Sequence, residues 1–359
     1  MSEQVLFSSF QLGRITLRNR VVMAPMTRNR SIGNVPGDIV VRYYEQRAEA
    51  GLIITEGTSP APDGLGYARI PGVFSAEQVA AWKKVTAAVH AKGGHIFVQL
   101  MHTGRASAQA NLPAGARVLG PSAIALSQPV FVDADGQVPA TMPETMTEAD
   151  IEAAIEQFAH ASAMAIEAGF DGVELHGANG YLIEQFLNTA SNARDDRWGG
   201  SVENRARFAV AVAERAAARV GADRVGVRLS PYGAFNDMTP DADTDALYAY
   251  LAKELARIGV VYVHVVDHSS MGAPEVKASV KQSIREGFGG TYILSGGYDG
   301  AKAEADLVAN KGELVAFGRP FIANPRLPSL LASGAELRAP DFSTFYTPGE
   351  KGYCDYPVD

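Results

Sequence analysis

Residues 173–182, VELHGANGYL, join an apolar strand-like run to a glycine-rich turn and the start of a helix. The run ends at His176, and the turn brings Asn179 and Tyr181 close behind it. A carbonyl oxygen accepts hydrogen bonds from two donors, and protonation of the carbon next to it requires an acid. These three side chains would supply those parts if they converged on one ligand. Asn and Gly are also ordinary turn residues, so these residues alone leave a purely structural role open.

The same strand-to-helix pattern repeats along the chain. Short apolar runs predict eight strands, at residues 21–26, 52–56, 95–100, 173–176, 225–229, 260–266, 292–294 and 314–317. Helices are expected over 39–50, 148–168, 181–187 and 201–220, with Thr147 as the cap of the second of these. A capping-box signature at Ser75 and Gln78 predicts another helix that ends at about Ala91. Four more helices are expected to begin near Thr244, Pro274, Gly300 and Asn324.

A closed (β/α)8 barrel accounts for this alternation better than a doubly wound sheet. Doubly wound sheets usually contain fewer strands and carry Gly-x-Gly-x-x-Gly after the first one, whereas residues 24–28 read APMTR. We therefore predict a single TIM-barrel domain over residues 1–359. An N-terminal hairpin cap is expected within residues 12–20, and a long irregular insertion over 103–146 after the third strand.

Composition excludes several classes of protein. The chain is 47% hydrophobic and 20% charged, so it can bury a sizeable core. Its net charge of -8 argues against a nucleic-acid binder, and no apolar stretch approaches the ~20 residues of a membrane helix. Cys354 is the single cysteine, so cysteine-bound zinc or iron–sulfur sites are not expected. No secretory signal is evident, and we expect a cytoplasmic location.

Polar residues stand at nearly every predicted strand end, where TIM-barrel enzymes place their chemistry. Together with the glycines beside them, the residues at these ends are Thr27, Glu56, Gly57, Gln99, His102, His176, Arg228, Asp267, His268, Ser295, Gly296, Gly297, Gly318 and Arg319. The glycine-rich loops after the last two strands predict a phosphate site, with Arg319 adding a charge-assisted contact.

Other chemistries fit the strand ends less well. No lysine stands at a strand end, which argues against a Schiff-base aldolase. His264, Asp267 and His268 suggest a metal, but a hydrogen-bond network at the strand ends explains them better, because no clear further ligand accompanies them. We therefore predict no metal site.

Several ordered blocks resemble the old yellow enzyme family of FMN-dependent ene-reductases, over essentially the whole chain. They are MAPMTR (23–28), GLIITEGT (51–58), QLMHTGR (99–105), HGANGYL (176–182), GGSVENRARF (199–208) and FGRPFIANP (317–325). The resemblance implies FMN over the barrel mouth, held by Pro25, Met26, Thr27, Gly57, Gln99, Arg228, Gly297, Gly318 and Arg319. Thr27 would lie near flavin O4, Gln99 at the pyrimidine side and Arg228 near N1 and O2.

The resemblance also implies an activity. NADPH or NADH would reduce FMN, and hydride would then pass to the β-carbon of an α,β-unsaturated carbonyl or nitro compound. His176 and Asn179 would bind the substrate oxygen, and Tyr181 would protonate the α-carbon. Met101 and Tyr67 would complete the substrate pocket, and the protein would be a monomer or homodimer.

Two departures from the family pattern bear on this expectation. Met101 stands where many members carry Trp after the strand-3 glutamine, so the family pattern does not define the shape of the substrate pocket here, although the reaction expected is the same. Thr27 places the chain in the branch without a cysteine on the first strand. The alternatives are a flavin-free barrel lyase or isomerase acting on a phosphorylated substrate, and a catalytically silent binding protein.

Overall fold

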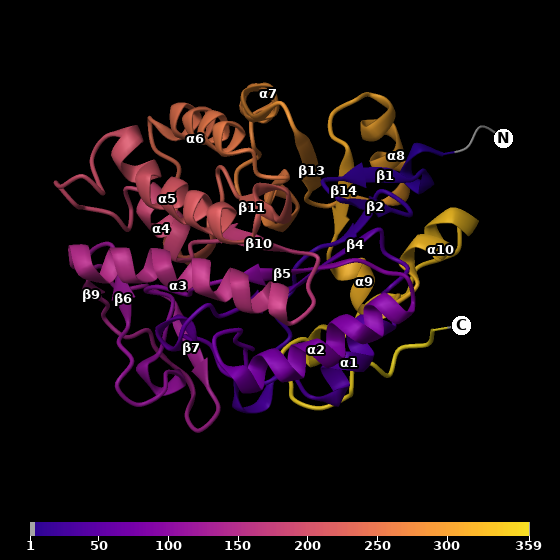
Figure 1. Cartoon of the computed structure of the whole chain (residues 1–359), viewed down its shortest axis with the longest axis horizontal. Coiled ribbons are helices and arrows are strands. Elements are labelled where there is room, and N and C mark those ends of the chain that lie inside the picture. The colour runs from indigo at the N-terminus through magenta and orange to yellow at the C-terminus, as the bar shows by residue number, and fades with distance from the viewer. Residues whose placement is uncertain (1–3, 359) are drawn as a thin grey trace.

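The computed structural model describes residues 4–358 (Figure 1). Eight parallel strands close into one barrel, in the order β3-β4-β5-β10-β11-β12-β13-β14. They are β3 (Val21–Met23), β4 (Leu52–Thr58), β5 (Ile96–Leu100), β10 (Gly172–Gly177), β11 (Val225–Leu229), β12 (Tyr262–Val266), β13 (Thr291–Ser295) and β14 (Leu314–Phe317). The barrel closes where Val315 of β14 pairs with Val21 of β3. Each strand overlaps a predicted one, so the predicted (β/α)8 fold is confirmed.

Helices surround the barrel, and their apolar faces pack on the outside of the strands (Figure 1). They are α1 (Asp38–Glu45), α2 (Ala76–Ala91), α3 (Glu148–Glu167), α4 (Leu182–Leu187), α5 (Val202–Val220), α6 (Thr244–Ile258), α7 (Ala278–Phe288), α8 (Gly300–Val308), α9 (Arg319–Ala323) and α10 (Leu327–Ser333). Ser75 and Thr147 form capping boxes at the starts of α2 and α3, as such sequences favour. Within residues 4–358, no helix is both long and apolar enough to cross a bilayer.

Three helix boundaries differ from the predictions. Helix α1 ends at Glu45 instead of Ala50, because the chain tightens into turns in which Ala48 N–H bonds to Glu45 O. Helix α7 starts at Ala278 and not near Pro274, because its N-cap, Lys277, still has non-helical backbone angles (φ -52°, ψ 139°). The segment after β14 is already helical before Asn324, because Pro320 lies in the first turn of α9, where proline is favoured.

The N-terminal hairpin closes one end of the barrel. Strands β1 (Phe10–Leu12) and β2 (Ile15–Leu17) pair antiparallel. Leu12 and Leu17 are fully buried in one cluster with interior side chains of the barrel strands, such as Val22. Apolar packing therefore fills this end, and a ligand must enter from the opposite end, where the strands finish at their C-termini.

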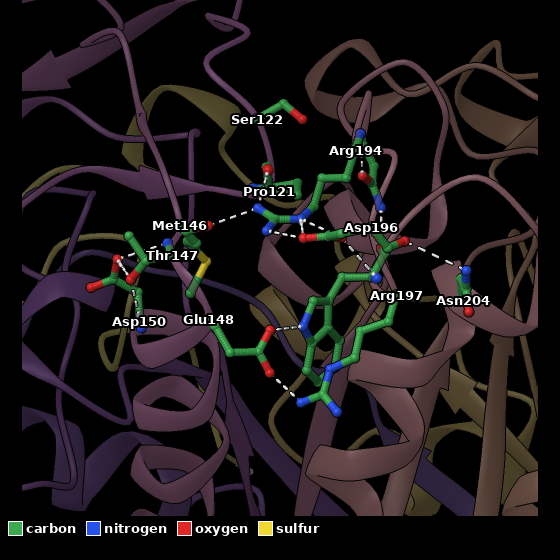
Figure 2. A network of polar contacts seen from close by, with 12 residues as sticks. Pro121, Ser122, Met146, Thr147, Glu148, Asp150, Arg194, Asp196, Arg197 and Asn204 are labelled. Atoms are coloured by element: carbon green, nitrogen blue, oxygen red, sulfur yellow. Dashed lines mark hydrogen bonds and ion pairs between the residues drawn. The ribbon is translucent and has the colours of Figure 1, made fainter.

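The insertion after β5 is more ordered than predicted. It contains a parallel pair, β6 (Leu119–Gly120) with β9 (Glu144–Thr145), and a hairpin of β7 (Pro129–Val132) and β8 (Gly136–Pro139). Figure 2 shows Arg194 donating hydrogen bonds to the carbonyl oxygens of Pro121 (2.9 Å) and Met146 (2.7 Å). Arg194 also pairs with Asp196 at 2.6 Å. The first two contacts fix Pro121, inside the insertion, and Met146, at its end, to the loop before α5.

Candidate active site

A cavity of about 890 Å³ opens at the C-terminal end of the barrel. It brings together twelve of the residues singled out in the sequence: Pro25, Met26, Thr27, Gln99, Met101, His176, Asn179, Tyr181, Arg228, Gly297, Gly318 and Arg319. These residues come from six different barrel strands or the loops after them. The volume is within the usual range for small-molecule and cofactor sites.

Gly57 and Tyr67 are not among the residues that line this cavity. Gly57 lies behind Met101, and a Cβ at position 57 would approach the Met101 sulfur to 2.4 Å. Tyr67 lies against Tyr181, edge to face, with ring centroids 5.9 Å apart. Both residues therefore support side chains of the cavity wall, and their direct contacts with a ligand stay a prediction.

Strand register aligns the polar residues of the floor. His176 pairs with Arg228, and Arg228 pairs with His264, across three neighbouring strands. One layer deeper, Glu174 pairs with Gln99. Because alternate residues of a strand share a face, Glu174 and His176 both point to the barrel interior.

Arg228 is a buried cation without a hydrogen-bond partner. Its side chain forms no hydrogen bond to any residue between 4 and 358, its Nε is fully shielded from solvent, and the residue is only 6% exposed. Burial lowers the pKa of Arg228, and the nearby Glu174 carboxylate opposes that shift. A guanidinium keeps its charge in proteins. A buried charge is costly unless it is paired, and Arg228 therefore indicates a ligand with an acceptor or negative charge at this point.

His176 and Asn179 offer hydrogen-bond donors to the same cavity. Burial, followed by the charges of Arg228, His264 and His268, lowers the pKa of His176 well below its ordinary value. The imidazole is therefore neutral, and its buried Nδ1 has no partner among residues 4–358. The Asn179 Oδ1 accepts a hydrogen bond from His268 Nε2 at 2.7 Å, which leaves the Asn179 amide hydrogens for a ligand.

Tyr181 lies beside these donors as the N-cap residue of α4. Its ring packs edge to face on the His176 ring at 4.9 Å. Burial and the neighbouring Tyr67 hydroxyl raise the pKa of Tyr181 well above its ordinary value. The phenol is therefore protonated at neutral pH and can donate a proton or a hydrogen bond.

A second buried carboxylate, Glu184, supports the turn that carries these residues. It accepts hydrogen bonds from Gly180 N–H (2.6 Å), Ser230 Oγ (2.8 Å) and Tyr248 OH (3.0 Å). Burial raises the pKa of Glu184 to about 7, against these hydrogen bonds. Asn179 and Gly180 both have positive φ angles, 60° and 71°, and a Cβ at position 180 would lie 2.7 Å from the Phe235 carbonyl oxygen. Only glycine therefore fits after Asn179.

The loops after β13 and β14 form the other end of the cavity. Gly297 has a φ of 63°, and a Cβ added at position 296 would lie 2.1 Å from the Asp267 carbonyl oxygen. This loop therefore requires glycine at both positions. Arg319 is exposed beside Gly318 and forms no ion pair with any part of the chain between residues 4 and 358. A free guanidinium next to two glycine loops suits a phosphate group.

FMN fits this arrangement of donors and charges. Its phosphate matches Arg319 and the glycine loops, and its polar ring edge matches Gln99 and the unpaired Arg228. A Cβ at Gly318 would lie in ordinary van der Waals contact with the Met26 sulfur, at 3.7 Å, so Met26 and Gly318 are neighbours in this wall of the cavity.

The C-terminal segment forms a rim that sequence reasoning missed. Phe342, Phe345 and Tyr346 line the cavity. Two arginines hold the segment: Arg28 Nη2 donates to Gly352 O at 2.7 Å, and Arg30 Nη2 donates to Thr344 O at 2.8 Å. Two closely spaced arginines were the only signal, and the sequence does not reveal that they are buried.

The suspected metal ligands are engaged in hydrogen bonds, as predicted. His264 Nδ1 contacts Glu174 at 2.8 Å, and Asp267 pairs with Lys281 at 2.6 Å. Between residues 4 and 358, no group of three or more His, Cys, Asp or Glu residues is arranged to hold a metal ion.

Comparison with known proteins supports a flavin site. A model of the NADH:flavin oxidoreductase / NADH oxidase family matches residues 5–338. 12-Oxophytodienoate reductase 1 of Oryza sativa subsp. japonica is 41% identical over 358 residues, covering 98% of this chain and 92% of the rice protein.

Solved structures agree in fold over almost the whole chain. Morphinone reductase in complex with tetrahydroNAD superposes with a TM-score of 0.93 at 42% identity, covering 99% of this chain and 98% of that one. The old yellow enzyme homologue from Zymomonas mobilis gives a TM-score of 0.91 at 37% identity, covering 98% and 99%.

Proposed function

The chain belongs to the NADH:flavin oxidoreductase / NADH oxidase family, and we propose that it is an ene-reductase acting on α,β-unsaturated carbonyl or nitro compounds. It is an oxidoreductase that uses FMN and a nicotinamide reductant. A flavin-free lyase or isomerase, the alternative from sequence, is therefore not retained. When bound, FMN carries a hydride equivalent from NADPH or NADH to the β-carbon of the substrate.

One observation carries the proposal: a single cavity is lined by both the cation on its floor and three donors beside it. Arg228 and Gln99 would hold the polar edge of the flavin ring, where a fixed cation stabilises negative charge. Pro25, Met26 and Thr27 would meet the ring from β3. Gly297, Gly318 and Arg319 would hold the phosphate.

His176 and Asn179 would bind the substrate oxygen and withdraw electrons from its double bond. Both can donate, because His176 is neutral and the Asn179 oxygen is already occupied by His268. Two oriented donors in a water-poor site stabilise the enolate-like charge that develops on that oxygen. Tyr181 would then protonate the α-carbon, since its raised pKa keeps the proton in place at neutral pH.

The pocket side is formed by Met101, with Tyr67 packed behind Tyr181. Met101 is flexible and polarizable, so it would adapt to substrates of different shape. We also propose that Thr27 marks the branch of old yellow enzymes without cysteine at this position. A single FMN-binding domain over residues 1–359, a cytoplasmic location and a monomer or homodimer stay predictions.

Purified protein tests the proposal directly. We expect a yellow preparation that loses its long-wavelength absorbance with NADPH or NADH and regains it with cyclohexenone, a maleimide or a nitroalkene. Steady-state rates with each nucleotide and acceptor would identify the preferred pair. A bound flavin that is reduced by the nucleotide but is reoxidised by none of these acceptors would contradict the ene-reductase assignment.

A further inference from the structure

Glu174 is a buried carboxylate beneath the proposed cofactor site, and none of the roles proposed above involves it. It is fully buried on β10. Three donors converge on it: Gln99 Nε2 at 2.8 Å, His264 Nδ1 at 2.8 Å and Tyr262 OH at 3.1 Å. These donors come from two further strands, β5 and β12.

The carboxylate determines which way the Gln99 amide faces. Gln99 Nε2 donates to Glu174 Oε1, so the group of Gln99 that contacts the carboxylate is the NH2. The Gln99 Oε1 is then on the opposite side of the amide. It has no hydrogen-bond partner in the part of the chain the structure describes, and Gln99 lines the cavity.

We propose that Glu174 is a positioning residue that presents the Gln99 carbonyl oxygen to the cavity, so that the site selects a ligand with an N–H donor at this point. The inference rests on the proposed cofactor role of Gln99. The pyrimidine edge of the flavin ring carries an N–H flanked by two carbonyl groups, and it meets both requirements of the floor. Its N–H would donate to Gln99, and a neighbouring carbonyl would accept from Arg228.

Glu174 also interacts electrostatically with Arg228, because its carboxylate raises the pKa of the guanidinium. A carboxylate below the site opposes the accumulation of negative charge on a ligand above it. Glu174 therefore has two separable effects: it orients Gln99, which strengthens binding of oxidised FMN, and it lowers the midpoint potential of the bound flavin.

The substitution Glu174→Gln separates these effects. An amide has one acceptor and one donor group, so the new side chain cannot accept from Gln99, His264 and Tyr262 together. Rotation of the Gln99 amide would then point its NH2 at the ligand N–H. We expect apoprotein to bind FMN about 10- to 100-fold more weakly, measured by quenching of FMN fluorescence, and the midpoint potential to become more positive.

Three further variants test the mechanism. In a Gln99→Ala background, Glu174→Gln should weaken FMN binding by less than about threefold, because its effect passes through Gln99. Glu313→Gln neutralises a partly buried carboxylate that pairs with Arg285 outside the cavity and does not contact Gln99, and it should leave FMN affinity unchanged. If Glu174→Gln does not fold, Glu174→Asp keeps the charge but withdraws it from Gln99, and it should weaken FMN binding without raising the potential.

The outcomes are distinct. Failure of wild-type apoprotein to bind FMN would contradict the cofactor site itself. Normal FMN affinity in Glu174→Gln or Glu174→Asp, or the same loss with and without Gln99, would contradict the positioning role only.

Discussion

Substitution of Tyr181 by Phe should separate the two halves of the reaction. The change removes one hydroxyl and keeps the ring, so the edge-to-face contacts with His176 (4.9 Å) and Tyr67 (5.9 Å) remain. Loss of a general acid typically slows the step that needs it by ~10²–10⁴-fold, equivalent to about 2.7–5.4 kcal/mol of activation free energy. Because the Tyr181 phenol is fully protonated at neutral pH, no part of this contribution is lost to ionisation.

Rapid mixing measures each half separately. The rate of flavin bleaching by NADPH or NADH should stay near the wild-type value, since that step needs no proton from Tyr181. Recovery of absorbance with cyclohexenone should slow by about 10²–10⁴-fold, while recovery with a quinone should not. Tyr250→Phe, on α6 and outside the residues that line the cavity, provides a matched control and should leave both rates unchanged.

The pH profile adds a second test of the same reasoning. The pKa of Tyr181 is raised, so the acid keeps its proton until the pH exceeds that value. The pKa of His176 is lowered, so the imidazole stays neutral until the pH falls below it. Neither group should titrate between about pH 6 and 9, so any decline of the enone step in this range must come from elsewhere. Wild-type enone rates in Tyr181→Phe would show that the proton comes from another group or from water.

Ligand binding, cofactor identity and acid stability offer three other tests. Phenols should bind to the wild-type protein with a long-wavelength charge-transfer band. The double variant His176→Ala/Asn179→Ala should abolish most of this binding, because the buried phenolate loses both donors. An unchanged phenol titration in the double variant would place the oxygen site elsewhere. Acid release and chromatography should yield FMN as the cofactor, and recovery of FAD would contradict a site with one phosphate end. Burial raises the pKa of Asp171, but hydrogen bonds from His90, His95 and Ile96 N–H outweigh it and lower the pKa overall. Asp171 in turn raises the pKa of His90. The stability advantage of wild type over Asp171→Asn in thermal unfolding should therefore be full between about pH 4 and pH 6.5, shrink as the pH falls below this range and shrink as His90 loses its proton above it; a constant advantage would refute the ionised clamp.

Much of the fold could be predicted because local sequence and tertiary structure agree. The eight strands are short apolar runs, and the capping boxes at Ser75 and Thr147 announce their helices. The start of α9 was misplaced because Pro320 suits the first turn of a helix as well as its termination. The β6–β9 pair in the insertion is held by Arg194, which contacts the residues that follow these strands, Pro121 and Met146, from more than forty residues away in sequence.

The site residues that stand at strand ends could be predicted from the sequence. The residues that act through partners on distant elements could be predicted only in part. Glu174 could have been found, because it lies two residues before His176 and so shares its face of β10. Glu184 could not, since its partners Ser230 and Tyr248 lie on other elements, and nothing in the sequence indicates that they meet.

The arginines that hold the C-terminal rim have a consequence for the order in which the protein matures on the ribosome. Arg28 and Arg30 are synthesised long before their acceptors, Gly352 O and Thr344 O, which follow them by 324 and 314 residues. Until then these guanidinium groups cannot be buried without large cost, and the cavity lacks Phe342, Phe345 and Tyr346. A nascent chain can therefore assemble barrel strands as they emerge, but it completes its cofactor site only once residues 342–352 have left the exit tunnel.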